Sequence, residues 1–314
     1  MKKHTEVRKY LITAALLLVT STWLFAADGG PDVEKKKTYS KSYPIGGNDK
    51  ININNQFGEV KIITWGKGEV KVDVTITVKG SSEERAQSIL DNISIEDSKS
   101  GDGVSFKTNI GKQEWKGDKK NGNNSNQSME INYEVNMPAG NPLNLENQFG
   151  KTYVPDMSGP VEITQKFGDL VAGNLTNIKD LHVEFGSAVV ESIGNCKVVI
   201  KFSKAEIKKL SGAIKGTFEY CDKLRLTLNN NVSDFSINNQ FSKIEVTVAD
   251  GFNGDFDIHT NFGEFHNSTP IVIKENKDSD EDHGPKFDKD YSGKSGSGAC
   301  KVKIKSSFGT VKFI

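Results

Sequence analysis

Acidic side chains at alternating positions are the first residues that could do chemistry. Glycoside cleavage needs two carboxyl groups at a fixed separation, and a metal-assisted reaction needs a metal with a base beside it. Here the outward acidic residues are interleaved with lysine in nearly every repeat, which is typical of a solvated surface. The acidic residues are Glu59, Glu162, Asp169, Glu184 and Glu206, and the lysines are Lys61, Lys166, Lys201, Lys204 and Lys208.

The histidines and cysteines do not add a reactive group. The histidines at 182, 259, 266 and 283 are scattered, and His182 and His259 fall at outward strand positions. The chain lacks Gly-x-Ser-x-Gly, His-Glu-x-x-His and Gly-x-x-x-x-Gly-Lys motifs. Three cysteines, Cys196, Cys221 and Cys300, are expected to be small core residues, with one disulfide as the alternative. We therefore predict no enzyme and no catalytic, cofactor-binding or metal-ligating residue.

An acidic and then Gly/Ser-rich segment at 274–298 is the remaining candidate for a metal site. Its carboxylates could gather around calcium, but the ordered Asp-x-Asp-x-Asp-Gly loop that ends in Glu is missing. We expect a solvated loop without a cofactor. The carboxylates are Asp278, Asp280, Glu281 and Asp282.

The beginning of the chain predicts export. Residues 1–26 combine a basic start, an apolar run to about Phe25 and the small residues Ala26 and Ala27, as in a cleaved signal peptide. An uncleaved anchor is the alternative, but the apolar run is short of the roughly 20 residues that a span needs. After cleavage the net charge is about −3, which argues against a nucleic-acid partner. We expect a periplasmic or cell-surface location and no transmembrane helix in the mature chain.

An aromatic residue, usually followed by glycine, returns through most of the chain. The steps from Phe149 to Phe262 are 17 to 21 residues long. Apolar residues alternate ahead of each aromatic and recur three and five places behind it, so the inward parity of the strand changes at this point. The nine aromatics are Phe57, Phe149, Phe167, Phe185, Phe202, Tyr220, Phe241, Phe262 and Phe308.

We interpret each pair as a last inward aromatic followed by a corner residue. Glycine suits a left-handed or bulged corner, and it occupies six of the nine; Ser203, Cys221 and Ser242 occupy the others. If the Phe185 side chain lies in the core as one rung of a stacked aromatic ladder, its replacement by Ala lowers the free energy of unfolding by about 3 to 5 kcal/mol. The polar residues two places earlier have inward parity and are expected to hydrogen-bond in a ladder. They are Asn55, Asn147, Gln165, Asn239, Thr260 and Ser306.

The fold class that follows is all-β: a single β-solenoid of stacked coils of about 18 residues. A unit of this length cannot bury its apolar side alone, whereas stacked units share a continuous core. A barrel or sandwich is the alternative, but it does not explain the return of one aromatic every 18 residues. We expect a linker at 27–45, an N-terminal β-rich cap at 46–140 and the solenoid at 141–314, with the acidic loop inserted at 274–298.

The cap is predicted to contain a short helix and a mobile loop. "SSEERAQSILDN" has capping serines and early glutamates, which suit a helix. "VSFKTNI" and "MEINYEVNMPAG" are expected to pair as antiparallel strands across the polar loop between them.

The arrangement resembles the putative adhesin family of exported bacterial proteins, common in Bacteroidetes. The resemblance covers about residues 45–314 and rests on "NQFGEVKIITW" and "YEVNMPAGNPLNLENQFGKTYV", above all on the "MPAG" turn before a Leu-x-Leu strand. It implies a binding or adhesin-like module of the envelope or surface, whose partner is an envelope protein or a polysaccharide. An envelope-stress or regulatory partner protein and a carbohydrate-active β-helix enzyme are the two alternatives.

Overall fold

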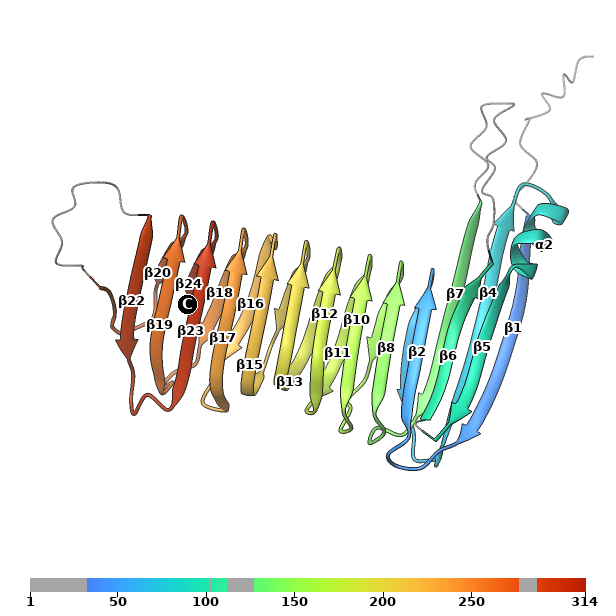
Figure 1. Ribbon diagram of the computed structural model, residues 1–314, viewed down its shortest axis with the longest axis horizontal. Helices are drawn as coiled ribbons and strands as arrows, with labels where there is room; N and C mark the ends of the chain where they lie inside the picture. Colours follow the sequence, from blue (N-terminus) through green and yellow to red (C-terminus); the bar gives the residue numbers. More distant parts are fainter. Residues whose placement is uncertain (1–32, 102, 112–126, 277–286) are drawn as a thin grey trace, which may run out of the picture.

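The part of the protein that the structure describes is elongated and all-β, with one short helix (Figure 1). The computed structural model describes residues 33–101, 103–111, 127–276 and 287–314. The predicted signal peptide, the expected mobile loop and the four acidic residues considered for calcium lie outside these residues. Within them, the strands form one mixed 24-stranded hydrogen-bonded network.

Two rows of parallel strands form the long body of this network, because each coil contributes one strand to each row. Strands at equivalent places in successive repeats pair in register: Ile163 lies beside Leu145 on one side and Leu181 on the other. The first row consists of β2 (Lys50–Gln56), β8 (Leu143–Gln148), β10 (Val161–Lys166), β12 (Ile178–Glu184), the second half of β13 (Ser187–Lys201), β15 (Leu210–Glu219), β17 (Val232–Gln240), β23 (Cys300–Ser307) and β19 (Gly254–Asn261).

The second row follows the aromatic corner. It consists of β3 (Val60–Thr64), β9 (Thr152–Val154), β11 (Asp169–Leu175), the first half of β13, β14 (Lys204–Ile207), β16 (Lys223–Leu228), β18 (Lys243–Val248), β24 (Thr310–Phe313) and β20 (Glu264–Asn267). The inward residues of both rows, such as Ile51 and Leu181 of the first and Val311 of the second, are buried in one hydrophobic core. The predicted alternation is thus confirmed.

The last coil of the chain is not the last coil of the stack. Strand β23 lies between β17 and β19, and β24 lies between β18 and β20. The chain therefore passes beyond this position with β19 and β20 and then returns to fill it. Sequence order alone would place β23 and β24 at the end of the stack, because the spacing of a repeat does not show where that repeat is inserted.

The N-terminal end is closed by strands that extend both rows, first in parallel pairing with β2 and β3 and then in antiparallel pairing with one another. It consists of β1 (Val33–Pro44), β4 (Glu69–Gly80), α2 (Glu83–Asp91), β5 (Ile93–Ser100), β6 (Gly103–Ile110) and β7 (Ser128–Met137). The helix is where the sequence predicts it, with the Ser82 hydroxyl accepting a hydrogen bond from the Arg85 amide. The edge strands β1 and β5 are joined because the Tyr39 hydroxyl donates a hydrogen bond of 2.7 Å to Asp97.

Three local predictions differ from the structure. Residues 33–44, expected within a linker, form β1, because their backbone pairs antiparallel with the whole length of β4. β6 and β7 do not pair with each other: β6 joins β2 and β5, whereas β7 joins β3 and β4. The segment expected to be a loop at 274–298 includes most of β21 (Ile273–Glu275) and all of β22 (Asp288–Lys294), which pairs with β19.

Candidate functional site: an exposed aromatic stripe

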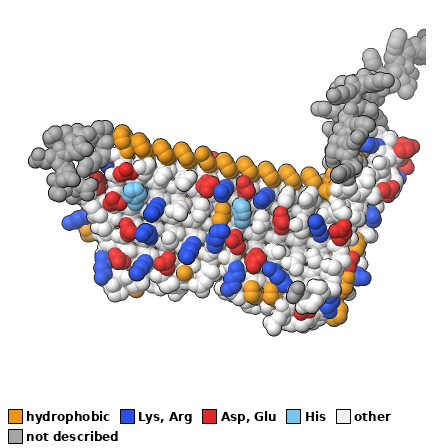
Figure 2. Space-filling model, in the orientation of Figure 1, with side chains coloured by type: hydrophobic (Ala, Val, Ile, Leu, Met, Phe, Trp, Pro, Cys, Tyr) orange, Lys and Arg blue, Asp and Glu red, His pale blue; other side chains and the backbone are white. Residues whose placement is uncertain are grey.

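Ten aromatic rings form a continuous stack along the corner between the two rows. Neighbouring ring centroids are 4.5 to 5.2 Å apart, and the planes are within 15° of parallel. Figure 2 shows this stack as an unbroken line of apolar atoms along the rim of the molecule. In stacking order, this aromatic stripe consists of Phe57, Phe149, Phe167, Phe185, Phe202, Tyr220, Phe241, Phe308, Phe262 and Phe287.

The aromatic side chains point outward, which corrects the prediction of interior rungs. Nine of the ten residues are 44–53 % exposed. The nine aromatics of the repeat have left-handed backbone angles, with φ between +47° and +64°. A residue in this conformation breaks the alternation of the strand, so the aromatic faces solvent while residues two before and one after it both face the core. The parity change is therefore at the aromatic and not at the glycine.

The glycine is required by close stacking of the backbone. A Cβ atom on Gly150 would lie 1.8 Å from the carbonyl oxygen of Gly58, and one on Gly168 would lie 1.9 Å from that of Gly150. Neither distance leaves room for any side chain. In the middle of the stack Ser203 occupies the corner, and its hydroxyl accepts a hydrogen bond of 3.0 Å from the Gly186 amide.

A left-handed conformation is costly for a residue with a Cβ atom, by about 1 to 2 kcal/mol. Stacking against the ring above and the ring below offsets part of this cost, at about 0.5 to 1.5 kcal/mol per aromatic pair. The stripe thus has a structural role, yet it leaves a long apolar surface in water.

The polar ladder predicted beside the aromatics is confirmed for five of its six residues, whereas the buried hydroxyl of Thr260 makes no hydrogen bond within the described part of the chain. Thr108 donates a hydrogen bond to Asn55 (2.8 Å), and Asn55 donates one to Asn147 (3.2 Å). The chain continues from Asn147 to Thr152 (3.1 Å) and then to Gln165. All these side chains are buried, so the hydrogen bonds satisfy polar groups that would otherwise destabilise the core. A second ladder joins Asn239 to Ser306 at 2.8 Å.

The stripe offers ring edges rather than ring faces. Because neighbouring rings are nearly parallel and about 4.9 Å apart, each internal ring has both faces covered by its neighbours. Stacking of a sugar ring needs an open aromatic face. The exposed surface is instead a narrow apolar ridge of C–H groups, which suits another apolar protein surface.

Charges of both signs flank the ridge. On the first row, the Lys201 ammonium lies 2.9 Å from the Glu219 carboxylate, and Lys166 lies 3.8 Å from Glu184. On the second row, the residues two places after the aromatics include Lys151, Lys204 and Lys243 as well as Glu59, Asp169, Asp222 and Glu264. Neither flank has an excess of basic residues, so the ridge lacks the electrostatic attraction to anionic lipid that a polybasic surface provides.

The acidic residues and histidines discussed for catalysis are not gathered by the fold. Glu162 and Glu184 each lie near a lysine, at 3.3 and 3.8 Å. In the part of the chain that the structure describes, no three His, Cys, Asp or Glu side chains are placed to hold a metal ion. His182 is partly buried on β12, and His259 lies 2.8 Å from Asp290 of β22.

The three cysteines are buried and free, as expected of small core residues. Burial raises the pKa of the Cys196 thiol to about 12 and that of Cys300 to about 11. Because the thiolate is the reactive form, these side chains are unreactive at neutral pH.

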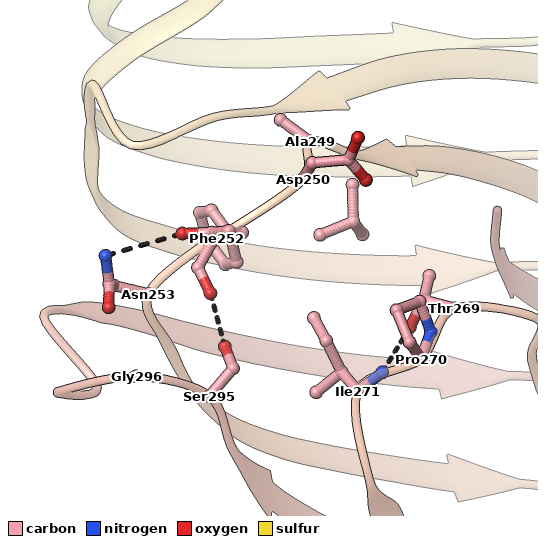
Figure 3. A pocket seen from close by; sticks show the side chains of 11 residues that line it. Ala249, Asp250, Phe252, Asn253, Thr269, Pro270, Ile271, Ser295 and Gly296 are labelled. Atoms are coloured by element: carbon pink, nitrogen blue, oxygen red, sulfur yellow. Dashed lines mark hydrogen bonds between the residues drawn. The ribbon is translucent and has the colours of Figure 1, made fainter.

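A small cavity lies at the strand ends that are away from the aromatic stripe, between the turns at 248–253, 269–271 and 295–296 (Figure 3). Its volume is about 220 Å³. Polar groups around it bond to one another: the Ser295 hydroxyl donates to the Phe252 carbonyl at 2.6 Å, and the Ile271 amide donates to Thr269 at 3.3 Å. The turns around the cavity thus bond to one another, and the Asp250 carboxylate is the charged group of the cavity lining.

Comparison with known proteins found similar solved structures of low sequence identity. No protein-family model and no curated protein matches it. Similar solved structures include a putative adhesin from Bacteroides fragilis (10 % identity, 88 % of this chain and 97 % of that chain, TM-score 0.35). Others are a putative cell adhesion protein from Clostridium sporogenes (12 %, 89 % and 99 %, TM-score 0.23) and a putative lipid binding protein from Parabacteroides distasonis (9 %, 88 % and 96 %, TM-score 0.38). The predicted resemblance to putative adhesins is confirmed.

Among the described residues, no helix has the length and apolar character needed to cross a membrane.

Proposed function

We propose that the protein is an exported, non-catalytic β-solenoid that acts as an adhesin-like binding module of the cell envelope or surface, with the aromatic stripe as its contact surface. The observation that carries the proposal is the size of this stripe. Nine steps of 4.5 to 5.2 Å extend it over roughly 40 Å. Rings of this size expose on the order of 900 Å² together, whereas the largest apolar patch of a typical monomer is about 300 to 600 Å².

Pull-down from intact cells tests this role. The protein carrying Phe167→Ser, Phe185→Ser and Phe202→Ser should capture at least about tenfold less material than the parent, because serine removes apolar contact area. The matched control is Val171→Ser with Val189→Ser, since these two exposed valines lie outside the stripe, on the second row. Equal capture by the parent and the stripe variant would contradict the proposal.

The solenoid class is supported by the parallel register between consecutive coils and is tested by removing one coil. In a stack, each repeat contacts only its neighbours, so a repeat can be removed and the ends joined. Deletion of 169–186 should leave a cooperative β-sheet protein that is one coil shorter, because Phe167 and Gly168 then precede the strand that starts near Ser187. Loss of the β-sheet circular dichroism signal would favour a closed barrel.

A further inference from the structure

We propose that the partner of the aromatic stripe is a second copy of this chain, which lies antiparallel along the first so that the two ridges meet about a twofold axis. This proposal rests on the proposed function, because it names the partner of the same surface. It follows from the pitch, the flanking charges and the exposed area of the stripe.

The pitch of the stripe matches that of a second copy. An apolar partner must meet rings that repeat every 4.5 to 5.2 Å, and a second stripe repeats at the same spacing. With ten rings, the centred antiparallel register places the twofold axis between the fifth and sixth rings. Phe202 then faces Tyr220 of the second copy, Phe57 faces Phe287 of the second copy, and every ring has a partner.

The flanking charges favour this register over its neighbours. In stacking order, the residues two places after the nine aromatics of the repeat are Glu59, Lys151, Asp169, Ser187, Lys204, Asp222, Lys243, Thr310 and Glu264. In the centred register, Lys151 faces Glu264 of the second copy and Lys204 faces Asp222. The other charged residues face Ser187 or Thr310, apart from Glu59, whose opposite position lies outside the described residues. No like charges meet.

A shift by one ring brings like charges together. In one direction, Glu59 faces Glu264 of the second copy and Lys204 faces its own equivalent. In the other direction, Asp169 faces Glu264, and Lys204 faces Lys243. Like charges in such contacts oppose association, so the shifted registers are disfavoured.

The other flank agrees with the centred register. The residues directly before the fifth and sixth aromatics, Lys201 and Glu219, form an ion pair within one chain at 2.9 Å. The antiparallel arrangement places this pair against an inverted copy of itself, so that each charge meets the opposite sign. Lys166 and Glu184 face the uncharged residues Ser307 and Gln240.

The exposed area is sufficient for a specific dimer. If the rings are largely covered, each chain buries on the order of 900 Å², and a standard interface buries about 800 Å² per partner. A lipid surface is less suitable because the flanks alternate in sign and the stripe is a ridge that offers an acyl chain no groove (Figure 2).

A charge-reversal cycle at the distant pair tests the register. Lys151 and Glu264 flank rings seven steps apart in one chain, which is roughly 35 Å and well beyond the screening length of about 10 Å at 0.1 M salt. Any coupling between them must therefore act between chains. Lys151→Glu alone and Glu264→Lys alone should each weaken the dimer by about tenfold, because each creates two like-charge contacts by symmetry. The two changes together should restore the parent affinity to within about threefold.

Analytical ultracentrifugation of the purified protein measures these constants. Lys215→Glu is the matched control, because this exposed lysine of β15 lies away from the stripe. It should leave the dimer unchanged. Phe202→Ser with Tyr220→Ser should give a monomer that keeps the β-sheet circular dichroism signal.

Three results would overturn the second-copy proposal: a monomeric parent at about 100 μM, a dimer insensitive to Lys151→Glu, or a double reversal that fails to restore affinity. Failure of the proposed function has a different signature. A monomeric parent that still captures envelope material through the stripe removes only the second copy as partner, whereas capture that is independent of the stripe contradicts the proposed function. If both proposals hold, the captured material is mainly this chain itself.

Discussion

Two columns of side chains run along the same corner of the molecule, one inside and one outside. The inner column combines glycine backbone contacts with hydrogen-bonded side chains such as Asn55, Asn147 and Gln165, all of which are buried. The outer column is the aromatic stripe, which is about half exposed. The two columns are close in sequence: in the first coil, Asn55 and Gly58 of the inner column flank Phe57 of the outer column.

The two columns support the stack by different means. Hydrogen bonds and backbone contacts in the core depend on geometry to within tenths of an ångström, and an unpaired group there is costly. Stacked rings at the surface can shift, and part of their benefit offsets a left-handed backbone. We therefore expect changes to the inner column to affect mainly stability, and changes to the outer column to affect mainly binding.

The largest expected loss of stability is at the glycine of the inner column. The Cβ atom of Gly168→Ala would lie 1.9 Å from the Gly150 carbonyl oxygen, so two stacked coils must move apart. We expect the free energy of unfolding to fall by at least about 3 kcal/mol, measured by urea denaturation. Gly66→Ala is the control because nothing lies within 4 Å of its Cβ position. Equal stability of Gly168→Ala and the parent would exclude the close stacking of these coils.

The next largest effect is expected at the polar ladder. Asn147→Leu removes the acceptor for Asn55 and the donor for the Gly58 and Lys151 carbonyls. Leaving these buried groups unpaired should lower the free energy of unfolding by about 2 kcal/mol. Asn144→Ser on the same strand is the control, since Asn144 faces outward; it should change stability by less than about 0.5 kcal/mol. A tolerated leucine at 147 would mean that the ladder contributes little.

A smaller effect is expected at the aromatic stripe. Phe185→Ala removes two stacking contacts of 4.8 and 4.9 Å but keeps the left-handed backbone. We expect a loss of about 1 kcal/mol, well below the 3 to 5 kcal/mol that an interior rung would cost. Phe185→Gly should lose less than Phe185→Ala, because glycine adopts positive φ without penalty. Urea denaturation of the pair checks this, and a glycine variant less stable than the alanine variant would argue against strain at the aromatic.

The alternating strands, the helix and most of the polar ladder could be predicted from the sequence, because each depends on local periodicity or capping. The outward direction of the aromatic side chains is also recorded in the alternation around them. Positions 58, 60 and 62 are inward and separated by two, so position 57 is the residue that breaks the alternation. The insertion of β23 between β17 and β19, and the contribution of Phe287, which directly precedes β22, depend on long-range pairing that no local pattern records.

His182 combines features of both columns: its side chain points outward from β12, but it is partly buried. Burial lowers its pKa below the usual 6.5, an effect that the nearby Glu184 carboxylate only partly opposes. The unfolded chain therefore binds this proton more readily than the folded protein does. The contribution of His182 to stability is complete above about pH 6.5 and is lost as the pH falls through the lower pKa of the folded state.

Replacement by glutamine should remove this dependence. His182→Gln should be less sensitive than the parent to a fall from pH 7 to pH 5.5, with a difference in melting temperature of about 1 °C. Thr247→Gln is the control because Thr247 is exposed on β18 and has no titratable group, so it should leave the pH profile unchanged. If the melting temperatures of His182→Gln and the parent depend on pH in the same way, burial of His182 does not lower its pKa and this prediction is wrong.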